Sequence, residues 1–478
     1  MRTSLGEVAT ATGGVLHGPA QLGVTAVVID SRTATPGSLF VALPGERVDG
    51  HAFAEQAVRA GAVAALVTRP VQVPHVIVSD AVAALGALAG SHRRTLSARV
   101  TGITGSVGKT STKDLLTTVL GQQGLVVGPP GNYNNDLGLP ITVLGASDDA
   151  AHLVLEMGSR APGDIARLCE IARPDTAVVL NVGSAHLGQF GSLAAIAAAK
   201  AELVSGTSGA VVLNADDPLV AAMGSLAPGR VRTFGAAGEV RGEGVAIGDD
   251  GCASYALVAE EGRAEVSLRL VGSHQVSNSL AAATVALTYG VGIEQIAAAL
   301  SIAVPRSRWR MEVGERADGV TVINDAYNAN PESARAALGA LMSMTRARRR
   351  RSWAVLGEMG ELGDRSVEAH EALGRFAAGL GVQRILVVGE GARPIHRGAA
   401  SEPGWAGEST WAPDLEAALE VLREQLRPGD VALVKASRAA GFERVAAAVL
   451  GEARTGEGGH PSAMRDNREV SHRNRQRR

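Results

Sequence analysis

The sequence contains few cysteines, few aromatic residues and almost no net charge, and each shortage excludes a class of protein. Its two cysteines, Cys169 and Cys252, are too few for a disulfide framework and lack metal-ligand spacing. Aromatic residues make up 3% of the chain, which argues against a base-stacking surface for single-stranded nucleic acid. A net charge of −2 gives no overall attraction to nucleic acid. No apolar run approaches the ~20 residues that a membrane-spanning helix needs.

The remaining composition is that of a globular protein, with 46% hydrophobic and 20% charged residues. The start of the chain, MRTSLGEVATATGG, has no apolar segment behind a basic one, so we expect no secretory signal. A chain of 478 residues exceeds one hydrophobic core, and we expect two to four domains. We therefore expect a cytoplasmic α/β protein that binds neither nucleic acid nor membrane.

Short apolar segments alternate with helical patterns, which predicts three α/β domains. Residues 1–97 form the first, and residues 98–304 a mostly parallel sheet with helices on both faces. Within the second, alternating apolar positions at 239–271 predict an antiparallel extension. Residues 305–453 predict a small Rossmann-like, doubly wound domain, and 454–478 a disordered basic tail. Strands are predicted at 24–29, 38–42, 62–67, 75–78, 100–103, 151–156, 176–181, 210–214, 319–324, 352–356, 384–388 and 430–434.

The segment TGITGSVGKTST, residues 101–112, is the most informative in the chain. A buried strand, a glycine turn, Lys-Thr and an amphipathic helix follow one another, and this arrangement holds the phosphates of a nucleotide. Lys109 would contact the β- and γ-phosphates, and the Thr110 hydroxyl would ligate Mg²⁺. The spacing departs from the general pattern because Ile103 stands where a glycine is usual. The alternative is a glycine turn that opens an ordinary helix.

Three polar residues follow the phosphate loop in the predicted central domain. Glu156 ends a strand, at the edge of the sheet where ligand sites of α/β proteins form. His186 follows the next predicted strand, and Lys200 interrupts an alanine-rich helix. Each also has an ordinary interpretation: a surface acid, a loop histidine and a lysine that reaches solvent. Together, close behind the phosphate loop, they favour a catalytic site.

The motifs TGSVGKT, GNYNNDLGLP, LEMG, NVGSAHLGQFGS, AAAKAELV, LNADDP and HQVSN resemble those of the Mur ligase superfamily, the ATP-dependent amino-acid ligases of peptidoglycan synthesis. NDAYNANPES and LGEMGELG resemble the branch that adds D-alanyl-D-alanine (D-Ala-D-Ala) to UDP-N-acetylmuramoyl-tripeptide. The block DSRTATPGSLFVALPGERVDGHAFAEQAVRAGA resembles the UDP-sugar-binding domain of the family. The resemblance covers residues 25 to 450. It implies an ATP-dependent ligase that works through an acyl phosphate. Its partners would be UDP-N-acetylmuramoyl-tripeptide and D-Ala-D-Ala, and the enzyme would be a monomer.

The resemblance also implies a role for each of the central residues. Lys109, His186 and Lys200 would be catalytic. Thr110, Glu156, His186 and Lys200 would hold two Mg²⁺ ions, and Lys200 aligns with a lysine that is carbamylated by CO₂ in several relatives. A carbamate would turn a repelling ammonium into an anionic oxygen ligand.

Further residues are assigned by the same resemblance. The nucleotide would be bound by the phosphate loop and by residues of two later motifs: Gly105, Ser106, Val107, Gly108, Lys109, Thr110, Ser111, His274, Asn278, Arg308, Asp325 and Asn328. Arg310 would reach phosphate when the domains close. The peptide substrates would be contacted by Ser31, Arg32, Asp49, His51, Asn134, Asn135, Asp136, Tyr327 and Asn330. Lys435 and Ser437 resemble a late Lys-Gly-Ser element in which Ala436 replaces the glycine.

Two other functions stay open at this point. The branch that adds the third residue of the peptide is the nearest rival, but the Asp-Asn-Pro-Arg motif of its diaminopimelate-adding members is absent from the sequence. A regulatory or scaffold protein that keeps the fold without the chemistry is the second. Retention of Lys109, Thr110, Glu156, His186 and Lys200 argues against it.

Overall fold

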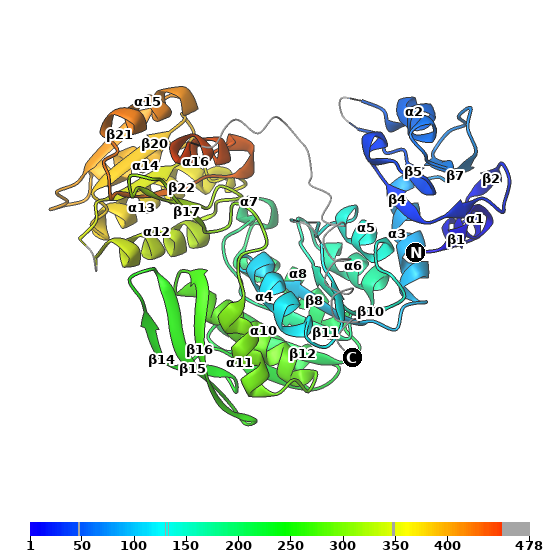
Figure 1. Ribbon diagram of the computed structural model, residues 1–478, viewed down its shortest axis with the longest axis horizontal. Coiled ribbons are helices and arrows are strands. Elements are labelled where there is room, and N and C mark those ends of the chain that lie inside the picture. Colours follow the sequence, from blue (N-terminus) through cyan, green and yellow to red (C-terminus); the bar gives the residue numbers. More distant parts are fainter. Residues whose placement is uncertain (46–47, 130, 132, 347–348, 452–478) are drawn as a thin grey trace, which may run out of the picture.

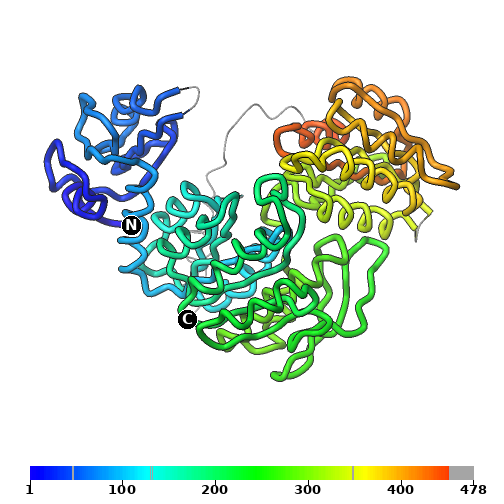
Figure 2. The backbone as a smooth tube through the Cα atoms, turned by 180° about the vertical axis from the view of Figure 1, so that it is seen from behind, coloured from blue at the N-terminus to red at the C-terminus, as the bar shows by residue number. Residues whose placement is uncertain are grey.

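A computed structural model describes residues 1–45, 48–129, 131, 133–346 and 349–451. The N-terminal and C-terminal domains stand apart from each other, and each rests on the central domain (Figures 1 and 2). The basic tail expected at 454–478 lies outside the described residues. Among the helices that are described, none is long and apolar enough to cross a membrane.

The N-terminal domain contains a five-stranded sheet in the order β2-β7-β6-β5-β4, with β2 antiparallel to β7 and the other pairs parallel. The strand expected at 24–29 is two short strands, because β3 pairs with β1 while β4 joins the main sheet. The elements are β1 (Thr3–Ser4), α1 (Leu5–Thr12), β2 (Val15–His17), β3 (Gly23–Val24), β4 (Ala26–Val28), β5 (Ser38–Val41), α2 (Ala54–Arg59), β6 (Ala64–Val67), β7 (His75–Ile77) and α3 (Ala81–Arg93).

The central domain is built on a six-stranded parallel sheet in the order β13-β12-β11-β8-β10-β9. Alternate residues of each strand enter opposite cores: Leu153 and Leu155 lie in one, and Val154 lies in the other. Helices therefore cover both faces, which confirms the expectation. The strands are β8 (Arg99–Thr104), β9 (Leu125–Val127), β10 (Ala150–Glu156), β11 (Thr176–Val179), β12 (Ala210–Asn214) and β13 (Val231–Phe234). The helices are α4 (Lys109–Leu120), α5 (Gly138–Leu144), α6 (Asp164–Ala172), α7 (Leu187–Phe190), α8 (Leu193–Ser205), α9 (Pro218–Ala221), α10 (His274–Thr288) and α11 (Ile293–Ile302).

The antiparallel extension is also present, as three strands that reach toward the C-terminal domain (Figure 1). These are β14 (Arg241–Ile247), β15 (Cys252–Ala259) and β16 (Gly262–Val271). Val271 packs in the same apolar core as residues of the C-terminal domain. A Cβ on Gly251 would lie 2.7 Å from Cγ of Met344 in that domain. This part of the central domain is therefore a close-packed contact with the C-terminal one.

The C-terminal domain has a six-stranded sheet in the order β17-β18-β22-β19-β20-β21, parallel except for β17 at one edge. Separate apolar cores on its two faces confirm a doubly wound arrangement. The strands are β17 (Glu312–Glu315), β18 (Thr321–Asn324), β19 (Ser352–Leu356), β20 (Arg384–Val388), β21 (Glu408–Ala412) and β22 (Val431–Lys435). The helices are α12 (Pro331–Arg346), α13 (Ser366–Gly379), α14 (Arg393–Ala400), α15 (Leu415–Gln425) and α16 (Glu443–Leu450).

The N-terminal domain is fixed to the central one through α3. A Cβ on Gly86 would lie 3.0 Å from Cδ1 of Ile171 in α6, so the two helices touch where the side chain is missing. Residues of both domains belong to one continuous apolar core. We propose that the domain boundaries fall near residues 97 and 304. The strands of the first sheet end before residue 97, those of the central domain lie between 97 and 304, and those of the last sheet begin after 304.

Candidate active site

The phosphate loop lies between β8 and α4, as the sequence predicts. Gly108 has a φ of 88°, a left-handed conformation that favours glycine. A Cβ there would also lie 2.4 Å from Oδ1 of Asn278, so a side chain has no room. Ile103, which replaces the usual glycine, is a fully buried residue of β8 and packs in the apolar core. Its departure from the general pattern therefore leaves the loop itself intact.

Lys109 is the first residue of α4, and its Nζ donates a hydrogen bond to the Gly105 carbonyl. Burial lowers the pKa of its ammonium to about 8, although the charge of Glu156 acts in the opposite direction. Arg310 of the C-terminal domain is close enough to lower it further. Lys109 and Arg310 thus place two cations near the phosphate loop, which suits a polyphosphate.

Thr110, the second residue of α4, forms a buried pair with Glu156, the last residue of β10. The Thr110 hydroxyl donates to Oε2 of Glu156 over 3.1 Å, and both side chains are at most 2% exposed. Parallel pairing of β10 with β8 places Glu156 beside Ile103, at the carboxyl edge of the sheet. Oε1 of Glu156 accepts no hydrogen bond from the described residues, although Nζ of Lys113 lies 3.6 Å away.

This donor set fits Mg²⁺, which prefers hydroxyl and carboxylate oxygens and keeps several waters. No cluster of three or more His, Cys, Asp or Glu able to hold a metal is found in the described part of the chain. A cation held by Thr110 and Glu156 would therefore need phosphate oxygens and water to complete its coordination.

Lys200 lies in α8 and is 5% exposed. Burial, and secondarily the charge of Lys109, lowers the pKa of its ammonium to about 7. The side chain has no hydrogen bond or ion pair with any residue that the structure describes. A buried lysine without a counter-ion is costly, and an amine that is largely neutral near pH 7 is nucleophilic.

His186 precedes α7 and has a left-handed backbone with a φ of 63°. Its Nδ1 lies 2.6 Å from Oε2 of Glu361, which belongs to the C-terminal domain. Burial lowers the pKa of the imidazole, while the Glu361 carboxylate raises it. The Glu361 contact was not expected from the sequence, although LGEMGELG contains this residue.

Asn278 and His274 lie in the first turns of α10, and Asn278 lies against Gly108 of the phosphate loop. The Asn278 side chain is 6% exposed and donates to Oε1 of Gln275 over 2.9 Å. Burial lowers the pKa of His274, and its Nδ1 has no hydrogen-bond partner among the described residues. HQVSN therefore lies next to TGSVGKT, which ends 164 residues earlier in the chain.

The C-terminal domain presents Asp325 and Lys435 at the ends of the neighbouring strands β18 and β22. Lys435 Nζ lies 2.5 Å from Oδ2 of Asp325 and donates to the Asn328 carbonyl over 2.9 Å. The guanidinium of Arg310 stacks on Tyr327, 4.1 Å from the ring centroid, and its Nε has no partner in the described part of the chain. Arg308 and Asn328 are exposed. Ser437 accepts a hydrogen bond from the Gly360 amide over 2.7 Å.

Several residues expected to bind substrate make local structural contacts. The side chain of Asn330 accepts a hydrogen bond from the Ser333 amide over 2.8 Å at the start of α12, and Asn135 accepts one from the Gly138 amide over 2.9 Å at the start of α5. Asp136 lies 3.7 Å from Arg167. Asn134 packs beside Gly158, where a Cβ would lie 3.1 Å from its amide oxygen.

The N-terminal candidates are also engaged locally. Arg32 forms an ion pair of 2.7 Å with Asp30, and Ser31 is buried in the same turn. Asp49 lies 2.5 Å from Nδ1 of His51, and Nε2 of the same imidazole accepts a hydrogen bond from the Thr68 amide over 2.9 Å. These contacts shape the loops, and the exposed guanidinium of Arg32 is the group most available to a diphosphate.

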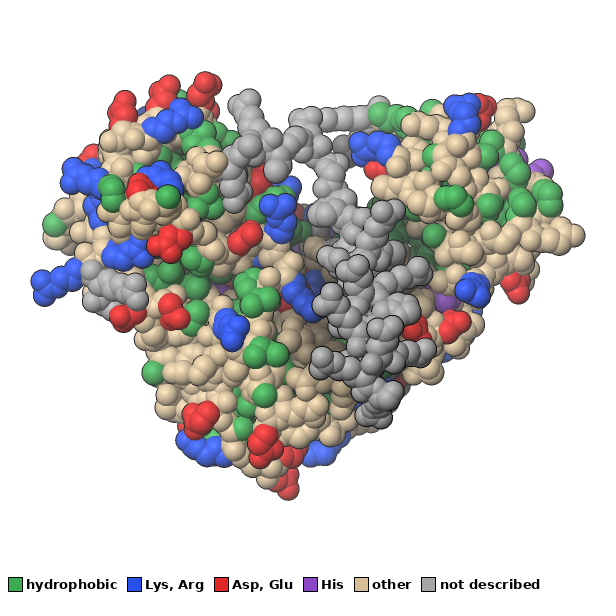
Figure 3. All heavy atoms as spheres, viewed as in Figure 1, with side chains coloured by type: hydrophobic (Ala, Val, Ile, Leu, Met, Phe, Trp, Pro, Cys, Tyr) green, Lys and Arg blue, Asp and Glu red, His purple; other side chains and the backbone are tan. Residues whose placement is uncertain are grey.

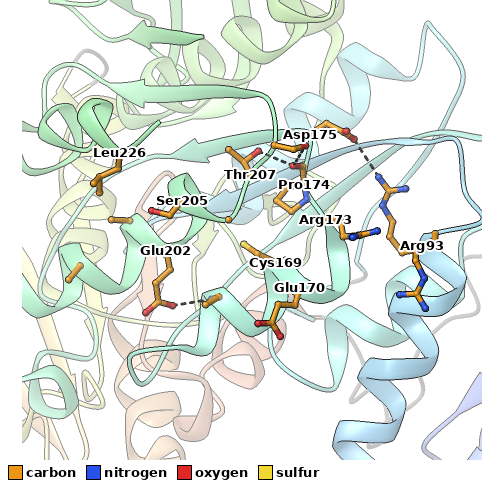
Figure 4. A pocket seen from close by; sticks show the side chains of 16 residues that line it. Arg93, Cys169, Glu170, Arg173, Pro174, Asp175, Glu202, Ser205, Thr207 and Leu226 are labelled. Carbon is orange, nitrogen blue, oxygen red and sulfur yellow. Dashed lines mark hydrogen bonds and ion pairs between the residues drawn. The ribbon is translucent and has the colours of Figure 1, made fainter. Parts of the chain in front are cut away.

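A pocket in the central domain lies elsewhere (Figure 4). Its volume is about 1120 Å³, and α3, α6 and α8 contribute to its walls. Asp175 precedes β11 and Thr207 precedes β12, so it opens at the amino edge of the central sheet, opposite the phosphate loop. An ion pair of 3.5 Å between Arg93 and Asp175 crosses it. Neither the phosphate loop nor Glu156, His186 or Lys200 lines it.

The candidate residues Lys109 and Glu156 instead lie at the carboxyl edge of the central sheet. On the face shown in the space-filling view, acidic and basic side chains of the described residues are interspersed (Figure 3). The candidate site receives residues from two domains, since Arg310 of the C-terminal domain lies near Lys109 and Glu361 contacts His186. It can hold a nucleotide against a second substrate.

Comparisons with known proteins agree with this geometry. The chain matches three family models: "Mur ligase family, catalytic domain" at residues 23–93, "Mur ligase middle domain" at 103–286, and "Mur ligase, glutamate ligase domain" at 309–438. It is 48% identical to the UDP-N-acetylmuramoyl-tripeptide--D-alanyl-D-alanine ligase of Mycobacterium tuberculosis, over 89% of this chain and 92% of the relative. The corresponding ligase of Escherichia coli is 35% identical over 93% and 98%.

Solved structures are similar over the same range. A crystal structure of MurF from Acinetobacter baumannii superposes with a TM-score of 0.86 at 31% identity, covering 95% of this chain and 99% of that one. MurF from Thermotoga maritima in complex with ADP gives a TM-score of 0.79 at 32% identity, over 90% and 98%.

Proposed function

This chain belongs to the Mur ligase family, and on that basis we propose how its residues join D-alanyl-D-alanine to UDP-N-acetylmuramoyl-tripeptide. It is a MurF-type ligase of peptidoglycan synthesis. The observation that carries the proposal is the buried Thr110–Glu156 pair at the phosphate loop, opposite Arg310 of the C-terminal domain. The phosphates and the acceptor carboxylate would meet between these groups.

A carboxylate acylates amines poorly, so ATP must first activate it. A carboxylate oxygen of the tripeptide attacks the γ-phosphorus, the bond to the β–γ bridging oxygen breaks, and ADP and an acyl phosphate result. The amine of D-alanyl-D-alanine then attacks the carbonyl carbon, phosphate leaves, and the nitrogen loses a proton. Positioning and charge neutralisation dominate such a phosphoryl transfer. Lys109 supports it at the phosphates, and Arg310 supports it from the other domain.

Thr110 and Glu156 would hold one Mg²⁺, and His186 and Lys200 would contribute to a second. The metal supplies neutralisation of phosphate charge when it is bound. Lys200 becomes an anionic ligand if its neutral amine adds CO₂ and releases a proton, which gives a carbamate. Its burial and its lack of a counter-ion support this modification.

The other assignments are proposals of the same kind. Asn278 and His274 would contact adenine, since Asn278 lies against the phosphate loop and an amide offers both a donor and an acceptor. Arg308, Asp325 and Asn328 would complete the nucleotide site. The UDP-peptide would be bound by Ser31, Arg32, Asp49, His51, Asn134, Asn135 and Asp136, and D-alanyl-D-alanine by Tyr327 and Asn330. We further propose that the enzyme acts as a monomer in the cytoplasm.

Hydroxylamine trapping tests the activated intermediate. With ATP, Mg²⁺ and UDP-N-acetylmuramoyl-tripeptide but no D-alanyl-D-alanine, we expect hydroxylamine to intercept the acyl phosphate and give a tripeptide hydroxamate, detected by mass spectrometry. Hydroxamate should form only when ATP is present. An enzyme that ligates efficiently when D-alanyl-D-alanine is supplied, but gives no hydroxamate in its absence, would contradict the acyl phosphate intermediate.

A further inference from the structure

The loop of residues 181–188, which contains His186, is held from two sides. On one side it bonds to the phosphate loop: the Val107 amide donates to Oδ1 of Asn181 over 2.9 Å, and the Gly183 amide donates to the Ser106 hydroxyl over 2.8 Å. All of these residues belong to the central domain. These two hydrogen bonds therefore do not involve the C-terminal domain.

On the other side the loop is held by Glu332, in the first turn of α12. The Ser184 amide donates to Oε1 of Glu332 over 2.8 Å, and the Ser184 hydroxyl donates to Oε2 over 3.0 Å. Both oxygens of one carboxylate are used, and hydrogen bonds to an ionised acceptor are the stronger ones. A Cβ on Gly183 would lie 3.0 Å from the carboxylate carbon, so the glycine permits the close approach.

Two further contacts join the same loop to the C-terminal domain. His186 lies 2.6 Å from Glu361, which is also 3.7 Å from Arg160 of the central domain. At the end of the loop the two backbones touch, since a Cβ on Gly188 would lie 2.8 Å from the Gly363 amide nitrogen. The C-terminal domain therefore contacts this loop at three places, namely Ser184, His186 and Gly188.

We propose that Glu332 is a positioning residue for the ligase reaction. Its carboxylate fixes loop 181–188 against the phosphate loop when the C-terminal domain docks, so that His186 and the phosphates are aligned only in the docked state. Glu361, through its contact with His186, is a second C-terminal residue that holds the loop. The inference rests on the proposed roles of Lys109 and His186, but it concerns a residue that contacts neither the phosphate loop nor the substrates.

The test compares Glu332→Gln, Ser184→Ala and the double variant with the wild-type enzyme. Glutamine keeps the size and can still accept the Ser184 amide, and the Ser184 hydroxyl can turn to accept from the glutamine NH₂ group, but neither hydrogen bond is then assisted by a charge. We expect kcat to fall about tenfold or more, as for the loss of a charge-assisted hydrogen bond. The dissociation constant of ADP alone should change less than about threefold, because Glu332 is not among the proposed nucleotide-binding residues, and the phosphate loop and α10 belong to the central domain. The double variant should be no slower than the slower single one.

Glu416→Gln is the matched control, since Glu416 lies in the first turn of α15 of the same domain, is exposed, and its side chain forms no hydrogen bond or ion pair with another domain in the described part of the chain. Small-angle scattering gives a readout that needs no activity: Glu332→Gln should have a larger radius of gyration than the wild type and Glu416→Gln. The inference is overturned if Glu332→Gln matches Glu416→Gln in kcat and scattering, if ADP binding weakens in step with kcat, or if the single effects add. A wild-type enzyme without ligase activity would refute the proposed function instead, and scattering would still decide the role of Glu332.

Discussion

Replacing Lys109 with methionine is expected to lower the rate of phosphate release by about 10²- to 10³-fold, the cost of losing one preorganised electrostatic contact to a transition state. Lys109 is the residue of the phosphate loop whose cation faces the site, at the N-terminus of α4. Methionine has a similar length and fills the same space without the charge. Steady-state phosphate release at saturating substrates measures the effect.

The substitution also separates this function of Lys109 from a structural one. Because burial lowers the pKa of Lys109, its ammonium is held at some cost to stability, and the variant should unfold at the wild-type temperature or above it. Binding of UDP-N-acetylmuramoyl-tripeptide in the absence of nucleotide should be retained. A variant that keeps more than about a tenth of the wild-type rate would remove Lys109 from the phosphoryl transfer.

Replacing Lys200 with alanine is expected to lower the ligation rate by about 100-fold or more, since changes around a metal site commonly cost 10- to 100-fold and a ligand should cost at least as much. High bicarbonate or a short carboxylate such as acetate should restore part of the activity by occupying the space of the lost carbamate. We expect a carbamate at Lys200 because its amine is buried and its pKa is lowered to about 7.

Carbon-13 NMR gives a direct reading of the modification. Wild-type enzyme in ¹³C-bicarbonate should show a carbamate resonance that is missing from Lys200→Ala. Full activity of the plain variant, without any added carboxylate, would show that Lys200 is not needed. An inactive variant with no carbamate signal in the wild type would leave Lys200 essential as an amine and refute the carbamate.

The sequence predicts the parts of the site that lie on one domain. The apolar strand β8 and the glycine turn fix the phosphate loop, and Glu156 is recognised because a parallel strand ends there. Asn135 and Asn330 were expected at the substrates, and in the structure Asn330 caps α12, while Asn135 accepts the amide of Gly138, the first residue of α5. A cap and a ligand contact require the same kind of side chain at the same kind of position, so the pattern alone does not separate them.

The cross-domain contacts could not be predicted. Glu332 and Ser184 are 148 residues apart, and their meeting depends on how two independently packed domains dock. Some strands were not predicted, for one of two reasons. β17 contains two glutamates and a glycine, and β21 begins with three polar residues, whereas β9 and β13 are only three and four residues long. Helix α1 was also missed, although Ser4 and Glu7 form a capping box that the sequence displays.

The central claim is that this enzyme couples ATP hydrolysis to the addition of a dipeptide. Phosphate release from ATP, followed with purified enzyme and Mg²⁺, tests it most directly. The account predicts release with UDP-N-acetylmuramoyl-tripeptide plus D-alanyl-D-alanine, in step with one ligated product per phosphate. Release only with a UDP-N-acetylmuramoyl-dipeptide and a single amino acid would contradict it.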